Sequence, residues 1–414
     1  MSVIRPFRGL RPRPGHCKTV ASPPYDVLSS DEARAMVRNN PDSFLRVNKP
    51  EVDFDAKESL YSDEVYEQGK KNLQRLIDEG IMCRDEKKCF YLYRLTWKNQ
   101  SQTGLVALSS CEEYNQGKIK KHEHTRPEKV DDRANHIQKV DAQVGPVFSI
   151  FRNNQEIHAL FDNITEKDPE YNFTSEDNVR HEMWIVYDAE IVNGLIVAFG
   201  NLDALYIADG HHRSAAASEV ARRMKEQNPN HTGEESYNFF LNVIFPDNEL
   251  RILPYNRVIK SLNGMTTEEF LNKIQNTFEV TPQSEKVEPE ESYCFGAFCG
   301  GKWYRLTAKK GSFDSDHPAN SLDSAVLTAN LLEPILNIKD IRTDKNIDFV
   351  GGIRGVQELE KLVNSGNYDI AFSLYPVEVA QLLAVADAGE VMPPKSTWFE
   401  PKLLSGMVVN ILDK

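Results

Sequence analysis

Short apolar runs alternate along the chain with longer segments in which apolar residues recur every three or four positions. The runs predict strands and the longer segments predict amphipathic helices. The expected strands lie at 90–97, 103–111, 146–151, 183–187, 204–208, 239–245, 293–298, 302–307 and 370–374. The expected helices lie at 29–38, 63–80, 127–143, 266–277, 321–336, 354–364 and 376–386. Because strands and helices do not alternate strictly, the pattern predicts an α+β fold with a mixed sheet.

The pattern also divides the chain. Residues 1–30 are rich in Pro, Gly and Arg, which excludes a regular helix there, and their aromatic and aliphatic residues predict an ordered loop pinned to the body. Beyond about residue 262 the distribution of strands and helices changes. We therefore expect an N-terminal and central α+β region at 1–262 and a C-terminal α/β region at 263–414.

The composition and charge of the chain argue against several classes of protein. A chain of 414 residues is long enough for two or three domains, and 40% hydrophobic with 27% charged residues is ordinary for a globular protein. The net charge of −13 argues against a dedicated nucleic-acid binder. The six cysteines form no C-x-x-C pair, no apolar run approaches ~18 residues, and the N-terminus has no apolar signal region. We expect a cytoplasmic protein without membrane or nucleic-acid partners, whose oligomeric state the sequence leaves open.

The most distinctive polar run is Asp209-Gly210-His211-His212-Arg213-Ser214, which follows the apolar run at 204–208 and opens a helical stretch. This order predicts a strand, a tight glycine turn and a helix N-terminus, where free N–H groups and the helix dipole favour an anion. Gly210 would let the backbone approach a ligand closely, and Arg213 can bind phosphate oxygens bidentately. His211 or His212 would add donors or take a proton, while Asp209 would hold Mg²⁺ or orient a histidine. The alternative is that Asp209 is a plain helix N-cap.

A second polar cluster carries His122, Glu123 and His124 directly after an expected strand. If the strand continues, the two histidines share one face and Glu123 lies on the other. Such a pair can bind a metal ion, with Asp209 as the third candidate ligand. Glu123 or His124 could instead serve as a general base. The spacing is not that of the H-E-x-x-H zinc motif, and a charged surface hairpin remains the alternative.

Two further segments are weaker candidates. In Pro23-Pro24-Tyr25-Asp26-Val27 the two prolines would hold the Asp26 carboxylate rigidly, or form an ordinary turn. Lys395-Ser396-Thr397, with Lys402 nearby, could contact phosphate or begin an exposed strand. The glycine-rich run at 351–355 lacks both the dinucleotide-binding spacing and the Walker lysine, so we expect a loop there.

Four motifs occur together and in a fixed order over nearly the whole chain. They are the segments at 23–27, 122–125, 206–213 and 392–397. Together they resemble the domain of unknown function 1015 family, whose members are uncharacterised conserved proteins. Members are often encoded near serine-biosynthesis genes, so the resemblance implies serine or phosphoserine chemistry.

Over a shorter stretch, the Asp209 run resembles the ParB/sulfiredoxin superfamily, in which the equivalent turn binds nucleotide phosphates. Sulfiredoxins have a catalytic cysteine after the glycine, where this chain has His211. ParB proteins are disfavoured by the net charge of −13. The free serine kinases of the superfamily have an Asp-Gly-His-His-Arg turn like this one. The resemblance implies a ParB/sulfiredoxin-like nucleotide-binding core with an extra α/β C-terminal part, in which His211, His212 and Arg213 contact nucleotide phosphates beside Asp209.

The leading interpretation is a small-molecule phosphotransferase, a nucleotide-dependent kinase acting on free serine with ATP, ADP or CTP as donor and Mg²⁺. In it the candidate catalytic residues are Glu123, His124, Asp26 and His212. The candidate nucleotide-binding residues are Asp209, Gly210, His211, His212, Arg213, Ser214 and Lys395. Three alternatives stay open: a phosphoserine hydrolase using the same pocket, a non-catalytic nucleotide-binding regulator, and a metal-dependent hydrolase built on His122, His124 and His211.

Overall fold

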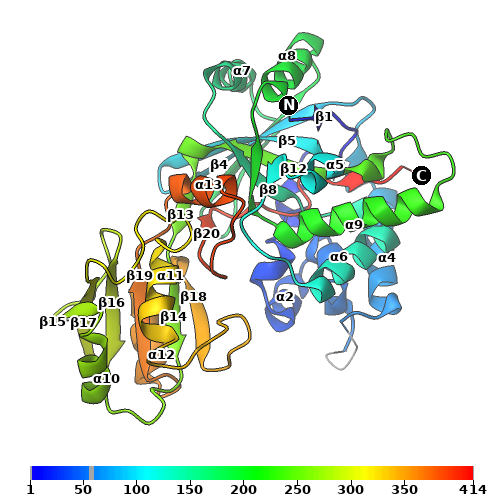
Figure 1. Ribbon diagram of the computed structural model, residues 1–414. Coiled ribbons are helices and arrows are strands. Elements are labelled where there is room, and N and C mark those ends of the chain that lie inside the picture. Colours follow the sequence, from blue (N-terminus) through cyan, green and yellow to red (C-terminus); the bar gives the residue numbers. More distant parts are fainter. Residues whose placement is uncertain (1, 56–59, 414) are drawn as a thin grey trace. The chain divides into compact units, whose positions relative to one another are not determined.

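The computed structural model describes residues 2–55 and 60–413, which form two compact units (Figure 1). The first comprises Met1–Leu250 and Pro401–Lys414, and the second comprises Arg251–Glu400. These bounds differ from the predicted regions 1–262 and 263–414. The second unit begins earlier because its first strands precede residue 262, and the end of the chain returns to the first unit.

A nine-stranded mixed sheet organises the first unit, with the strand order β6-β11-β8-β12-β5-β4-β10-β9 and β1 added beside β5. β11 runs parallel to β6, and β12 runs parallel to β8, whereas the other neighbours are antiparallel. The strands of this sheet are β1 (Ile4–Arg5), β4 (Phe90–Trp97), β5 (Gln100–Ser110), β6 (Ile119–Lys120), β8 (Val147–Phe151), β9 (Tyr171–Thr174), β10 (Arg180–Val186), β11 (Leu205–Asp209) and β12 (Phe239–Pro246). The predicted α+β class with a mixed sheet is confirmed.

Two short strand pairs tie the ends of the chain to this unit. They are β2 (Leu10–Pro12) with β3 (Met82–Arg84), and β7 (Ala142–Gln143) with β21 (Asn410–Ile411). Leu10 and Val409 also exchange backbone hydrogen bonds of 2.9 and 2.8 Å. The prediction that this segment is ordered and pinned to the body is therefore confirmed for residues 2–30, and the chain end is held beside them. The exclusion of a regular helix there is wrong, because the segment contains the short helix α1 (Cys17–Val20) as well as β1 and β2.

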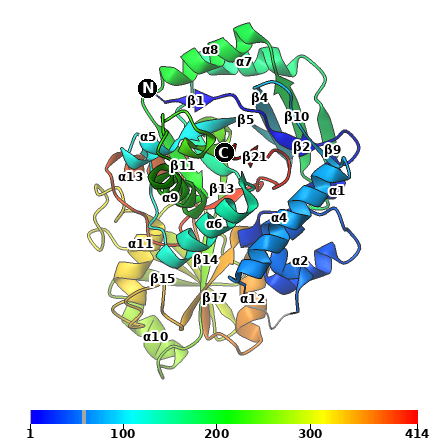
Figure 2. The same ribbon diagram turned by 90° about the vertical axis from the view of Figure 1, so that its right-hand side faces the viewer.

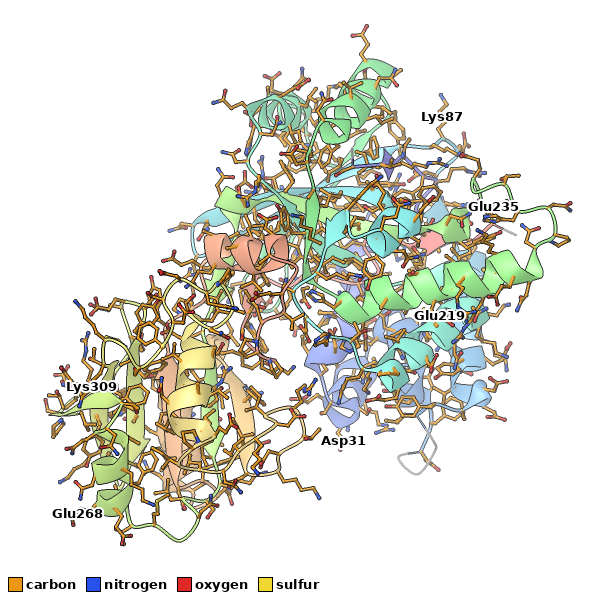
Figure 3. All side chains as sticks on the ribbon, viewed as in Figure 1. Asp31, Lys87, Glu219, Glu235, Glu268 and Lys309 are labelled. Atoms are coloured by element: carbon orange, nitrogen blue, oxygen red, sulfur yellow. The ribbon has the colours of Figure 1, made fainter. Side chains whose placement is uncertain are left out.

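The α-helices of the first unit pack against one another in groups. They are α1 (Cys17–Val20), α2 (Ser30–Val37), α3 (Leu45–Asn48), α4 (Asp63–Asp78), α5 (Cys111–Asn115), α6 (Pro127–Val140), α7 (Gln155–Thr165), α8 (Ala189–Gly200) and α9 (His211–Gln227). α4, α6 and α9 lie side by side, and α7 packs on α8 (Figures 1 and 2). Glu219, which is labelled on α9 in Figure 3, forms ion pairs with Arg222 and Arg223.

The second unit is built on a six-stranded antiparallel sheet. Its strand order is β15-β17-β16-β19-β14-β18. The strands are β14 (Tyr255–Ile259), β15 (Phe278–Gln283), β16 (Cys294–Cys299), β17 (Lys302–Ala308), β18 (Ile347–Gly351) and β19 (Ile370–Leu374), with β13 (Arg251–Leu253) and β20 (Trp398–Glu400) as a separate pair. The helices are α10 (Thr267–Ile274), α11 (Asp323–Leu327), α12 (Val356–Asn364) and α13 (Val379–Asp387).

Alternating strand residues build the two faces of this second sheet. On β14, Ile259 packs in the cluster that contains Phe270 of α10, whereas Val258 packs in the cluster that contains Leu359 of α12. This is the period-2 alternation expected of a sheet covered on both faces. The helix predicted at 321–336 is shorter than expected, because the α-helix gives way after Leu327 to a π-helical turn at 328–332.

Most predicted elements of the first unit are confirmed within a few residues. The capping box at Ser29 is present, with the Ser29 side chain accepting from Glu32 N–H. The strand expected to continue through His122 is wrong, because β6 ends at Lys120 and the chain leaves the sheet there. Across residues 2–55 and 60–413, the structure contains no helix long and apolar enough to cross a membrane.

Candidate functional site

The turn between β11 and α9 has the strand–glycine–helix form that the sequence predicts. Residues Leu205 to Ala208 are buried, and β11 ends at Asp209. Gly210 adopts φ 90° and ψ 28°, a left-handed conformation that side chains disfavour, and α9 begins at His211. A Cβ at Gly210 would lie 3.4 Å from Val147 Cα and 3.5 Å from Arg213 Cδ. The glycine is therefore needed for the left-handed turn, whereas a Cβ would be in ordinary van der Waals contact with these neighbours.

The start of α9 is suited to an anion. Gly210 is the N-cap and supplies no side-chain acceptor, and no acidic residue lies in the first helical turn. The N–H groups of this turn and the positive end of the helix dipole favour negative charge. The alternative in which Asp209 caps the helix is wrong, because its Oδ1 accepts from the Gly210 N–H at 2.8 Å, one position before the helix.

Asp209 forms an ion pair with Lys402, which lies in the C-terminal segment of the first unit. The Lys402 Nζ lies 3.0 Å from Asp209 Oδ2, although 193 positions separate the two residues. Burial by itself would raise the pKa of Asp209, but the positive charges of Lys402 and Arg213 outweigh it and hold that pKa below its usual value. Asp209 is therefore ionised and the ammonium of Lys402 is fixed beside the turn.

Arg213 connects the turn to the proline-rich segment at 23–27. Its Nη1 donates to the Pro146 carbonyl oxygen and its Nη2 to Asp26 Oδ2, both at 2.7 Å. Burial would lower the pKa of Arg213, but Asp26 and Asp209 raise it above its usual value, so the side chain is charged. Each terminal nitrogen has a second N–H and Nε has no hydrogen-bond partner, so Arg213 retains donors for phosphate while it holds these two oxygens.

Tyr25, next to Asp26, lies between two guanidinium groups. The Arg133 guanidinium carbon is 4.4 Å from the centre of the Tyr25 ring, and that of Arg213 is 5.7 Å away. Such contacts stabilise the cations and fix the ring. The segment containing Asp26 is thus brought to the Asp209 turn, as the motif set predicts, and Arg133 of α6 joins it.

The histidines and Glu123 form the other side of the site. The rings of His122 and His211 meet edge to face, 4.5 Å apart, and His211 Nδ1 lies 3.8 Å from Glu123 Oε2. Burial lowers the pKa of His122 to about 4 and holds that of His211 well below its usual value, so both rings are neutral at pH 7. His211 Nε2 is buried and has no hydrogen-bond partner, and Glu123 is about half exposed beside it.

Other predicted site residues have different surroundings. His212 Nε2 accepts the N–H of Arg126, the residue that precedes α6, and so His212 helps to start that helix. Ser214 donates to the His211 carbonyl oxygen at 3.0 Å, which is a bond within α9. His124 is exposed on the loop after β6. Lys395 belongs to the second unit, where its Nζ lies 5.5 Å from the centre of the Tyr255 ring, and its role at the turn stays a prediction.

The predicted metal ligands do not form a site. His122 is buried and His124 is exposed, because the segment after Lys120 is a loop rather than a strand. In the part of the chain that the structure describes, no three His, Cys, Asp or Glu side chains are grouped so that they could hold a metal ion. The structure therefore does not support a metal site made of His122, His124 and Asp209. It also does not support a metal-dependent hydrolase built on His122, His124 and His211.

The burial of His122 predicts a pH dependence of stability. Its pKa falls from 6.5 in the unfolded chain to about 4 in the folded one, so below pH 6.5 the folded state binds fewer protons. The free energy of unfolding then drops by about 2 kcal/mol between pH 6.5 and roughly pH 5 from this residue alone. We expect His122→Gln to remove about that much of the difference between urea unfolding at pH 7 and pH 5. His124→Gln, which removes an exposed imidazole two residues away, is the matched control, and equal pH dependence in wild type and His122→Gln would contradict the assignment.

Comparison with known proteins gives one family and several distant structures. A family model described as protein of unknown function, DUF1015, matches residues 4–325. No curated protein matches the chain. A free serine kinase in complex with AMP resembles it at 12% identity and a TM-score of 0.36, covering 71% of this chain and 86% of the kinase.

Two further solved structures are similarly distant. A conserved hypothetical protein from Pyrococcus furiosus has 13% identity and a TM-score of 0.37, covering 74% of this chain and 95% of its own. C-terminally truncated SbnI from Staphylococcus aureus has 11% identity and a TM-score of 0.38, covering 72% and 85%. Likenesses at this level carry no conclusion about function.

Proposed function

We propose that this chain, which belongs to the DUF1015 family of proteins of unknown function, is a small-molecule phosphotransferase that transfers a phosphoryl group from a nucleotide to the hydroxyl of free serine. The observation that carries the proposal is the β11–α9 turn. It combines an uncapped helix N-terminus after a left-handed glycine with two fixed cations, Lys402 and Arg213. Phosphoryl transfer depends above all on positioning and on neutralising charge, and these groups supply both.

The choice of serine as acceptor has a different support. It comes from the likeness of the run Asp209 to Arg213 to the turn of free serine kinases. ATP, ADP and CTP all remain candidate donors, because every one of them presents the phosphate groups that this turn would bind. A reaction that uses such a nucleotide suits the cytoplasm.

Glu123 is the proposed general base. Its carboxylate is about half exposed, next to the buried neutral His211 at 3.8 Å. In the reaction, the serine oxygen attacks the terminal phosphorus of the nucleotide as Glu123 takes the hydroxyl proton. The new O–P bond forms, the bond from phosphorus to the bridging oxygen breaks, and the shortened nucleotide leaves with the electron pair. His211 would position the Glu123 carboxylate.

Mg²⁺ would come with the nucleotide. Mg²⁺ is commonly held by one or two carboxylates together with substrate phosphates, rather than by an all-protein cage. This fits the site, because Asp209 is an ionised carboxylate next to the turn. When bound, the ion would supply neutralisation of phosphate charge, and Asp209 would be the carboxylate that contacts it.

Nucleotide binding tests the proposal directly through thermal stability. A ligand at 100 times its dissociation constant stabilises the folded state by about 2.7 kcal/mol, so we expect ATP, ADP or CTP with Mg²⁺ to raise the melting temperature. Arg213→Met should abolish that rise. Arg223→Met, on the same helix but paired with Glu219 and Asp131, should keep it. No shift with any nucleotide, but one with phosphoserine alone, would contradict the kinase and favour the hydrolase.

A further inference from the structure

A small, partly open cavity lies behind the glycine turn, within the first unit. Its volume is about 30 Å³. Val147 and Arg213 line it, and these are the two residues that approach Gly210 most closely. Phe240 and Leu241 of β12 contribute an apolar wall, while Tyr25, Asn48 and Arg133 contribute polar groups. The cavity therefore adjoins the proposed phosphate-binding turn and has room for a group about the size of a carboxylate.

The side-chain amide of Asn48, which lines this cavity, is buried without hydrogen-bond partners. The residue is 1% exposed, and neither its Nδ2 nor its Oδ1 has a hydrogen-bond partner. Its backbone is engaged: the N–H donates to the Phe44 carbonyl oxygen at 3.0 Å, and the carbonyl accepts from Arg133 Nη1 at 3.4 Å. Leaving a buried amide without partners is unfavourable, so such groups are normally satisfied by water or by a ligand. The Asn48 side chain therefore has an unused donor group, Nδ2, and an unused acceptor, Oδ1.

The charge around the cavity is positive. Arg133 and Arg213 both line it, and the lining contains no aspartate or glutamate among the described residues. The acids that balance them bind the guanidinium groups, Asp132 through Arg133 Nε and Nη2 and Asp26 through Arg213 Nη2. Arg213 Nε remains buried without a partner. Two guanidinium groups and a free amide donor are the chemistry that binds a carboxylate.

We propose that this cavity holds the α-carboxylate of an amino-acid acceptor, with Arg133 and Arg213 on the carboxylate. The Asn48 amide donates to the carboxylate through Nδ2 and accepts from the α-ammonium through Oδ1. The hydroxyl-bearing side chain of the acceptor extends past Arg213 toward the turn at Gly210. This assignment rests on the proposed function, and it explains why an amino acid rather than a simple alcohol is the acceptor.

Asn48→Asp tests the assignment with little change of shape. The new carboxylate would lie next to Arg133, so the fold should be kept, but it removes the Nδ2 donor and repels a bound carboxylate. We expect the affinity for L-serine, measured by titration calorimetry, to fall at least tenfold while nucleotide affinity stays the same. Asn135→Asp makes the same change on the exposed side of α6, where Asn135 contacts Arg223, and should bind serine like the wild type.

A ligand series on the wild-type protein gives a second test that needs no variant. Serine and glycerate carry a carboxylate, ethanolamine has none, and inorganic phosphate is the competing oxyanion. We expect serine to bind most tightly, glycerate to bind measurably and ethanolamine not to bind. Ethanolamine binding as well as serine, phosphate displacing serine from the cavity, or Asn48→Asp keeping full serine affinity would each overturn the assignment. Nucleotide binding without serine binding would overturn only this cavity's role, whereas loss of both would overturn the proposed function as well.

Discussion

Replacing Glu123 with glutamine should lower the rate of phosphoryl transfer by about 10²- to 10⁴-fold, the usual contribution of a general base. Glutamine keeps the length and shape of the side chain but cannot take the serine proton. Nucleotide affinity should be unchanged, because Glu123 lies beside His211 rather than on the Lys402 and Arg213 side of the turn. The measurement is the turnover number from the rate of phosphoserine formation, together with a nucleotide titration.

The matched control is Glu128→Gln, which removes an exposed carboxylate from the first turn of α6. It should transfer phosphate at the wild-type rate. A positioning role for Glu123 would leave the acidic limb of the pH–rate profile in place, whereas loss of the base should remove it. Transfer by Glu123→Gln within a few-fold of wild type would assign the base to another group.

Gly210→Val should have the largest effect on nucleotide binding. A β-branched residue at φ 90° is strained by about 1–3 kcal/mol, and relief of that strain moves the first N–H groups of α9. A Cβ at this position would lie at ordinary contact distance from Val147 and Arg213, so the expected effect comes from the backbone strain. We expect at least a tenfold loss of nucleotide affinity in a calorimetric titration, with a melting temperature lower by several degrees.

Gly233→Val is the control that separates a loss of stability caused by backbone strain from a loss of nucleotide affinity caused by a change in the turn. Gly233 has a φ of 92° and no neighbour within 4 Å of a Cβ, and it lies in the loop after α9. It should lose stability to a similar degree and bind nucleotide normally. Equal losses of affinity in both variants would mean that the effect of Gly210→Val comes from general destabilisation, and the turn would lose its assigned role.

The turn itself could be predicted from the sequence because its signals are local. An apolar run, a glycine and a helix-forming stretch occur within a few residues around Gly210, and the backbone follows that order. The prediction that the strand continues through 122–124 is wrong for the opposite reason. Its alternation contains only polar residues, so it carries no inside–outside information, and β6 stops at Lys120 after a two-residue pairing with β11.

Long-range contacts account for what the sequence missed. Lys402 and Lys395 are close in the chain, but the boundary between the two units falls after Glu400, so only Lys402 belongs to the unit of Asp209. The engagement of Arg213 by Asp26 and by the Pro146 carbonyl depends on three segments meeting. Asn48 carries no sequence signal at all, because an amide becomes informative only when the structure shows it buried without partners.

The central claim is that this site moves a phosphoryl group from a nucleotide to serine. The most direct measurement is ³¹P NMR of wild-type protein incubated with L-serine, Mg²⁺ and, in separate samples, ATP, ADP or CTP. We predict a new phosphomonoester signal matching O-phosphoserine, growing in step with loss of the terminal phosphate of one nucleotide, and absent with Glu123→Gln. Nucleotide that binds without any phosphoserine appearing, or added phosphoserine that is instead hydrolysed to inorganic phosphate, would contradict the account.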